Sequence, residues 1–231
     1  VHWFSPSVLA RAGIKVVLSA AFGDYLDKRE LQHSLGAHLH TELAGEDEIW
    51  IDLIADTADG FDPTYTVAWA ASQATLQPDG ADRPLPRGRY LIMAGDEVYP
   101  LGSPAEYENR LIGPYKAALP WTDADHPYLL AIPGNHDWYD GLTGFMRVFG
   151  QRKWIGGRRT VQQRSYFAIG LPHRHWLWVI DIQNDAYVDA AQIDYFKLAA
   201  SQMHSGDRLI LCTAKPSWTY SDPEFLALTT R

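Results

Sequence analysis

The chain has 231 residues, of which 46% are hydrophobic and 21% are charged, and this composition indicates one sizeable folded domain. Its net charge of -8 argues against nucleic acid as the main partner, because binding to a phosphate backbone requires a positive surface. The single cysteine, Cys212, excludes an internal disulfide, and no apolar run of about 18 residues offers a transmembrane helix, so we expect a cytoplasmic protein.

The first 47 residues indicate a helical extension followed by a linker. Residues 7–32 are expected to form a helix, because apolar side chains recur at three- and four-residue spacing. The members of this apolar stripe are Ile14, Val17, Leu18, Ala21 and Tyr25. We expect the stripe to pack on the domain, with peripheral contact to a membrane surface as the alternative. In the linker, His38 and His40 stand at alternate positions, which leaves open a metal-binding pair or a solvated segment.

Apolar strands alternate with helical segments from residue 48 onward. The expected order is strand 48–56, helix 65–75, strand 90–94, helix 103–119 and strand 128–132. Repeated strand-helix units build a mostly parallel sheet, and the carboxyl ends of its strands share one edge. Because each strand ends in a polar cluster, we expect Asp56, Asp96 and Asn135 to converge at that edge.

The second half of the chain continues the α/β pattern. Its expected elements are helix 141–149, paired strands 165–169 and 175–181, helix 189–203 and a buried strand at 207–213. In the last helix, Ile193, Phe196 and Leu198 are the candidate buried positions. A basic run leaves a local anion-binding surface open, and its members are Arg152, Lys153, Arg158, Arg159 and Arg164.

The segment 129–140 contains the most closely spaced candidate functional residues in the sequence. It begins as a buried-strand pattern, breaks at Pro133-Gly134, and continues with Asn135, His136 and Asp137. A strand that delivers polar side chains at its carboxyl end is where α/β proteins place ligands, and glycine lets the backbone approach one closely. The alternative is a solvated turn closed by a hydrogen-bonded cap.

Two motifs and one upstream aspartate resemble a known family. Gly95-Asp96-Glu97-Val98-Tyr99 and Gly134-Asn135-His136-Asp137, preceded by Asp56, resemble the calcineurin-like metallophosphoesterase superfamily. The spacing Gly-Asp-Xaa-Xaa-Tyr is most similar to its purple acid phosphatase branch. The resemblance covers about residues 49–216. It implies a layered α/β sandwich of mixed sheets flanked by helices, spanning residues 48–231 and lacking its last strands, behind an N-terminal extension of residues 1–47.

The resemblance implies a centre of two metal ions, either divalent or mixed-valence (Fe, Mn or Zn). In that centre Asp96 bridges both ions, Asp56 binds the first, Asn135 binds the second through its amide oxygen, and Tyr99 adds a phenolate to the first. Hard oxygen ligands suit such cations. Two ions about 4 Å apart also lower the pKa of a shared water, and the resulting hydroxide attacks phosphorus in line.

The remaining two motif residues, His136 and Asp137, are not expected to bind metal. His136 is implied to face the phosphate of a small-molecule phosphoester and to protonate the leaving group. Asp137 is expected either to orient His136 or to cap the following helix. Five further residues flank the motif in sequence and are candidates to line the site: Trp138, Tyr139, Arg147, Arg158 and Arg159.

The sequence departs from the family pattern at two strand ends. Ala58 stands where the family carries His or Gly, and Ala214 stands where it carries a metal-binding His. Lys215 follows and is expected to hold a phosphate or a carboxylate, or to be solvated. Possible substitutes for the missing ligand are His126, His173, His175 and His204. The final Gly-Xaa-His ligands are not present, so we expect the sequence to be part of a longer protein.

Three functions therefore stay open at this point. The first is metal-dependent hydrolysis of a phosphoester. The second is a non-catalytic protein of the same fold that binds a phosphorylated ligand or a protein partner, which Ala214 favours. The third is a nucleotide-binding α/β domain, although the sequence has neither of the glycine-rich phosphate loops that define such domains.

Overall fold

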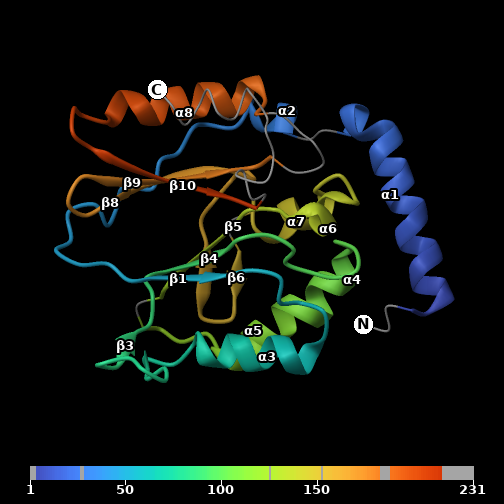
Figure 1. The fold of residues 1–231 in the computed structure, drawn as a ribbon, viewed down its shortest axis with the longest axis horizontal. Helices are drawn as coiled ribbons and strands as arrows, with labels where there is room; N and C mark the ends of the chain where they lie inside the picture. The colour runs from blue at the N-terminus through green and yellow to red at the C-terminus, as the bar shows by residue number, and fades with distance from the viewer. Residues whose placement is uncertain (1–3, 27–28, 125, 152, 183–187, 215–231) are drawn as a thin grey trace.

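The computed structural model describes residues 4–26, 29–124, 126–151, 153–182 and 188–214 (Figure 1). Its larger sheet has the strand order β1-β4-β5-β7-β6. These strands are β1 (Ile51–Ile54), β4 (Tyr90–Met93), β5 (Tyr128–Ala131), β7 (Arg158–Thr160) and β6 (Trp154–Ile155). The first four are parallel, and β6 pairs with β7 in the antiparallel sense. The mixed α/β class expected from the sequence is therefore confirmed.

The three predicted strands end at the same level. Ile54, the last residue of β1, pairs with Met93 of β4, and Met93 pairs with Ala131 of β5. The turns that follow these strands consequently leave the sheet along one edge. This confirms the sheet arrangement on which the predicted convergence of polar side chains depends.

Residues along β4 face two different cores in alternation. Leu91 and Met93 belong to a core shared with the helices that follow the strands, whereas Tyr90 and Ile92 belong to a core shared with the second sheet. Successive side chains of a strand point to opposite faces, so both faces of this strand are covered. This is why its sequence is an uninterrupted apolar run.

The helices that cover the first of these faces follow the parallel strands. They are α3 (Phe61–Ala70), α4 (Pro104–Tyr107), η1 (Glu108–Ile112), α5 (Gly113–Ala118), α6 (Asn135–Trp138) and α7 (Thr143–Val148). The predicted helix 103–119 is present with Ser103 as its N-cap, because its side chain accepts from the Glu106 amide at 3.3 Å. A π-helical turn precedes Pro114, whose missing N–H interrupts the regular pattern. The predicted helix 65–75 ends early, because α3 stops at Ala70 and Thr75 already belongs to a strand. A short hairpin, β2 (Thr75–Leu76) and β3 (Leu85–Pro86), lies between α3 and β4.

The second sheet has the order β10-β9-β8 and carries the last helix on its outer face (Figure 1). Its strands are β8 (Phe167–Leu171), β9 (His175–Ile180) and β10 (Arg208–Thr213), and the helix is α8 (Ala190–Gln202). The layers therefore run helix, sheet, sheet, helix. The predicted pairing of these two strands is confirmed, and β8 and β9 pair in the antiparallel sense.

Two predictions about burial in this half are wrong. In α8, Ile193 and Leu198 are 39% and 40% exposed. The buried stripe of α8 is Ala191, Gln192, Tyr195, Phe196 and Ala199, so of the three candidates only Phe196 was correctly placed. The predicted buried strand β10 exposes Leu209 and Ile210, because it is the last strand in the order and pairs with β9 alone among the described residues.

The N-terminal helix exposes the apolar stripe that was predicted to pack on the domain. The expected helix 7–32 is divided into α1 (Pro6–Leu26) and α2 (Arg29–Gln32). Within α1, Ile14 is 61% exposed and Val17 is 66% exposed. The half-buried positions are Ser5, Val8, Ala12 and Lys15, at the start of and along this helix. The apolar stripe therefore faces away from the domain, and α1 lies along one side of the molecule (Figure 1). No helix within the described residues combines the length and apolar character that crossing a membrane requires.

Candidate functional site

Two aspartates leave the sheet edge in the same unusual backbone conformation. Asp56 follows β1 with φ 57°, and Asp96 follows β4 with φ 52°. Aspartate enters this left-handed region more readily than most residues, and Gly95, at φ 115°, precedes the second aspartate. The amide of Asp56 donates to the carbonyl of Gly95 at 3.1 Å, which joins the two turns. Both carboxylates thus lie above the ends of neighbouring strands.

Tyr99 connects these carboxylates. Its hydroxyl lies 2.8 Å from Oδ1 of Asp56 and 3.1 Å from Oδ2 of Asp96, so one hydrogen is shared between two acceptors. Burial is the largest cause of the raised pKa of Tyr99, and the hydrogen bond and negative charge of the two aspartates raise it further. The phenol is therefore neutral, and three oxygen donors meet at one point. Asp56 is exposed and Asp96 is half-buried, so this point is open to solvent.

The turn that follows β5 packs directly on Asp96. The amide of His136 donates to Oδ1 of Asp96 at 3.0 Å. A Cβ atom at Gly134 would lie 2.1 Å from the same oxygen, so this close approach requires glycine. Asn135 stands between these two contacts, and its amide nitrogen donates to the hydroxyl of Tyr139 at 2.7 Å. The amide oxygen of Asn135 is consequently the atom that can serve as a ligand.

The ring of His136 is held on three sides. It makes edge-to-face contacts with Tyr99 and Tyr139, at centroid distances of 4.6 and 4.9 Å. Its Nδ1 lies 2.9 Å from the carbonyl oxygen of Pro100. Because a carbonyl can only accept, Nδ1 carries the hydrogen of this bond.

Two roles were left open for Asp137, and its hydrogen bonds are those of a cap, while the carbonyl of Pro100 contacts the His136 ring. The Asp137 side chain is fully buried and accepts from the amides of Gly134 at 2.9 Å and Glu97 at 3.2 Å. It also accepts from the hydroxyl of Tyr107 at 2.5 Å. Its contacts match the capping alternative, because Asp137 closes the first turn of α6 and fastens it to the loop after β4.

Glu97 is a supporting residue that was not singled out from the sequence. It is 2% exposed and accepts from the amide of Gly95 at 3.1 Å. Burial raises the pKa of Glu97 well above its ordinary value, and the charge of Asp137 raises it further. Burial also raises the pKa of Asp137, against the hydrogen bonds that lower it. The only sequence signal was its position between Asp96 and a buried valine, where a carboxylate must be paired or neutral.

The end of β10 reaches the site, as the sequence predicted. A Cβ atom at Gly95 would lie 3.0 Å from the Cβ of Ala214, so a methyl group faces the turn that carries Asp96. Lys215 lies outside the described residues. Ala58 is fully buried in the core beneath the helices and offers no ligand.

None of the four histidines proposed as substitutes for the missing ligand lies at this edge. Their polar contacts are with other segments: His126 with the carbonyl of Gly157, His173 with that of Asp47, His175 with that of Pro172, and the His204 amide with Asp207. His175 pairs with Arg208, the first residue of β10, whereas Ala214 follows its last residue. His175 therefore lies at the opposite end of the strand pair from Ala214 and is not a substitute for the missing ligand.

The predicted basic run does not form one surface. Arg158 and Arg164 are buried, and Arg159 pairs with Tyr128, at the start of β5 and away from the site. The guanidinium of Arg158 donates to the carbonyl of Ala71 at 2.5 Å, and burial lowers its pKa to about 10. Arg147 lines a separate cavity of about 290 Å³. Arg152 lies outside the described residues.

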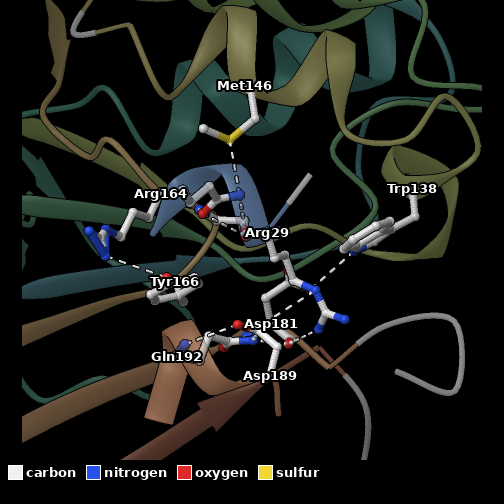
Figure 2. A network of polar contacts seen from close by, with 10 residues as sticks. Arg29, Trp138, Met146, Arg164, Tyr166, Asp181, Asp189 and Gln192 are labelled. Atoms are coloured by element: carbon white, nitrogen blue, oxygen red, sulfur yellow. Dashed lines mark hydrogen bonds and ion pairs between the residues drawn. The ribbon is translucent and has the colours of Figure 1, made fainter. Parts of the chain in front are cut away.

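Trp138 does not line the site; its side chain is buried and contacts Asp181 and Arg29. Its indole N–H donates to Oδ1 of Asp181 at 3.0 Å, and the guanidinium carbon of Arg29 lies 5.2 Å from the centroid of the ring. Figure 2 shows these residues together with Asp189. Arg29 also lies 3.5 Å from a carboxylate oxygen of Asp189 and donates to the Asp181 carbonyl at 3.2 Å. Arg29 belongs to α2, so the N-terminal segment buries a charged side chain directly behind the His136 turn.

A hollow of about 460 Å³ adjoins the site. It is lined on one side by Asp59, Pro100 and Leu101, which follow the site residues in the chain, and on the other side by Val8 and Arg11 of α1. Arg11 is exposed. The hollow is also lined by Glu106 and Arg110, so its walls combine apolar side chains with charges of both signs.

No protein-family model, curated protein or solved structure matches the chain.

Proposed function

We propose that the protein is a metal-dependent phosphoester hydrolase whose two metal ions are held by Asp56, Asp96, Tyr99 and Asn135. The observation that carries this proposal is the shared hydrogen bond of Tyr99, which draws Asp56 and Asp96 to a common point from two different strands. The resemblance of both motifs to calcineurin-like metallophosphoesterases supports the same reading.

The donor set of carboxylate, phenol and amide oxygens suits hard cations such as Mn²⁺ or Fe³⁺, and the borderline ion Zn²⁺ also accepts carboxylate oxygens. Neighbouring oxygen ligands of a six-coordinate ion lie about 2.9 Å apart when the metal–oxygen bonds are about 2.0–2.1 Å. The distances of 2.8 and 3.1 Å from Tyr99 to the two carboxylates match that spacing. Two cations bound there would supply Lewis acidity and lower the pKa of a water molecule.

The proposed role of His136 is to transfer the proton to the leaving oxygen. The Pro100 carbonyl fixes Nδ1, so the proton is exchanged at Nε2. The rings of Tyr99 and Tyr139 limit rotation of the imidazole, and the buried carboxyl of Asp137 fastens the turn that carries it. The neighbouring hollow accommodates the organic part of the ester.

A specific observation also favours the non-catalytic alternative, in which the protein binds a phosphorylated ligand without turnover. Ala214 presents a methyl group to the Gly95 turn and cannot ligate a metal. The shell formed by the described residues is therefore rich in oxygen and contains no imidazole from the end of β10.

The two functions are separated by measuring turnover and binding in the same preparation. The protein is loaded in turn with Fe, Mn and Zn, and release of p-nitrophenol is followed from p-nitrophenyl phosphate and from bis-p-nitrophenyl phosphate. Metal-dependent turnover of either substrate supports the hydrolase. Stoichiometric metal and tight binding of vanadate or phosphate without turnover would favour the binding protein, and absence of metal binding would overturn both metal-based readings.

A further inference from the structure

A second group of metal-ligand side chains lies on the linker, beside β8. The amide of His40 donates to the carbonyl of Ala168 at 3.0 Å, and its carbonyl accepts from the amide of Gly170 at 2.8 Å. The carbonyl of His38 accepts from the hydroxyl of Tyr195 at 2.7 Å. These contacts hold residues 38–40 as a short extended segment along the edge of the second sheet.

The extended backbone brings the two imidazoles together. Side chains at alternate positions of an extended chain point to the same side, and the rings of His38 and His40 meet edge to face at 4.8 Å. Glu42 completes the group. One ligand atom from each of the three residues lies within 4.8 Å of the others.

One pair in this group has the spacing found in a four-coordinate metal site, and the other ligand atoms lie within 4.8 Å. Nε2 of His38 lies 3.3 Å from Oε1 of Glu42. Two ligands of a tetrahedral zinc site lie about 3.3–3.4 Å apart when the bonds are about 2.0–2.1 Å. Two neutral imidazoles and one carboxylate are also the donors that borderline divalent ions prefer.

One of the three candidate ligands is buried, and the other two are exposed to solvent. His40 is 2% exposed and packs edge-on against Phe167 at 6.3 Å, whereas His38 and Glu42 are exposed. A neighbouring cation, Arg164, is directed elsewhere, because it donates to the carbonyl of Leu35 and lies over the ring of Tyr195. Three protein ligands and an open position are therefore present.

We propose that His38, His40 and Glu42 bind one borderline divalent metal ion of the Zn²⁺ class, independently of the oxygen-rich site at the other sheet. Bound there, the ion links the linker turn to a segment already fastened to β8. It would stabilise the attachment of the N-terminal region to the second sheet. This site does not depend on the proposed hydrolase.

The ligand chemistry allows the two sites to be told apart in the intact protein. The described candidates at the hydrolase site are oxygen donors, whereas the linker site provides two imidazole nitrogens. Cu²⁺ is added as a probe, and hyperfine coupling to histidine nitrogen is measured by pulsed electron paramagnetic resonance. Zn²⁺ affinity is measured in parallel by equilibrium dialysis against a competing chelator.

The expected result is coupling to two imidazoles in the wild type and its loss in His38→Ala/His40→Ala. Glu42→Gln, an exposed change that leaves both rings in place, should keep the nitrogen coupling and weaken Zn²⁺ binding about 10-fold or more. The matched control is His173→Ala/His175→Ala, which removes a pair with the same spacing and should change neither readout. Circular dichroism checks that each variant is folded.

Retention of the two-nitrogen signal in folded His38→Ala/His40→Ala would overturn the proposal. So would its loss in the His173→Ala/His175→Ala control, or Zn²⁺ affinity that Glu42→Gln leaves unchanged. Hydrolysis is not a readout in this experiment, so its outcome stands apart from that of the proposed function.

Discussion

Oδ1 of Asp56 accepts a hydrogen bond at 2.8 Å from the hydroxyl of Tyr99, a residue 43 positions further along the chain. The bond joins the turn after β1 to the loop after β4, and Asp96 shares the same hydrogen. Since burial and the two carboxylates raise the pKa of Tyr99, the phenol stays neutral without a cation. Coordination of a metal by its oxygen would therefore release a proton.

The first prediction concerns Tyr99→Phe. The ring contact with His136 is kept, but the shared hydrogen and one oxygen donor are lost. We expect metal affinity to fall about 10-fold or more, with fewer protons released on binding. Calorimetry in two buffers of different ionisation enthalpy measures both quantities. Equal affinity and equal proton release in the two proteins would remove Tyr99 from the metal shell.

The second prediction concerns Gly134→Ala. The added Cβ would lie 2.1 Å from Oδ1 and 2.2 Å from the amide nitrogen of Asp96, so the turn and the carboxylate must separate. We expect a loss of about 1–3 kcal/mol in the free energy of unfolding, from overpacking, together with weaker metal binding. Urea unfolding and dialysis provide the measurements.

The matched control for this change is Gly45→Ala, where a Cβ would meet nothing within 4 Å. It should change stability by a few tenths of a kcal/mol and leave metal binding unaltered. A Gly134→Ala protein with wild-type stability and metal content would show that the close approach to Asp96 is not required.

The third prediction concerns stability at alkaline pH. Burial raises the pKa of Tyr115 to about 12, whereas its ordinary value is 10.0. Because the folded-state pKa is the higher one, the contribution is intact below about pH 10 and is lost as the pH rises toward 12. We expect Tyr115→Phe to flatten the fall in stability between these values.

Urea titrations from pH 8 upward measure this slope. Tyr65→Phe, at an exposed tyrosine, is the control and should leave it unchanged. The neighbouring Arg158, whose pKa burial lowers to about 10, acts in the opposite direction, so the difference between variants is the readout. An identical slope for wild type and Tyr115→Phe would contradict the assignment.

The fourth prediction follows from the apolar face of α1. Ile14 and Val17 are exposed, and Arg11 and Lys15 lie on the same helix, which suits an anionic membrane surface. We expect sedimentation with vesicles that contain phosphatidylserine, and a marked reduction for Val17→Glu. The control is Leu209→Glu, at an exposed aliphatic of β10. The membrane contact would be excluded if the wild-type protein did not bind the vesicles, or if Val17→Glu bound them as well as the wild type does.

The sheet edge was predictable because local pattern and topology agreed. Apolar runs that end at Asp56 and Asp96 specify two strands, and parallel pairing then fixes where those residues meet. Of the two strands only β4 is buried throughout, because β1 is the first strand in the sheet order and its Leu53 is 64% exposed. The place of Ala214 beside the Gly95 turn was implied by the family resemblance and not by the strand pattern.

The errors arose where long-range packing decides which face of an element is buried. In α1 an apolar stripe was present, but the side that meets the domain is the one carrying Ala12 and Lys15. For Asp137 the sequence left open an orienting and a capping role, and only the structure shows its side chain turned toward Glu97 and Tyr107. No pattern in a single sequence specifies these tertiary choices.

The fifth prediction tests the division of roles at the proposed hydrolase site most directly. Metal content and phosphate release are measured together for Asp96→Ala and His136→Ala in the full-length protein. We expect Asp96→Ala to lose both metal and hydrolysis, and His136→Ala to keep its metal while hydrolysis falls about 100-fold or more. Full metal content in Asp96→Ala, or loss of metal from His136→Ala, would contradict the proposed assignment.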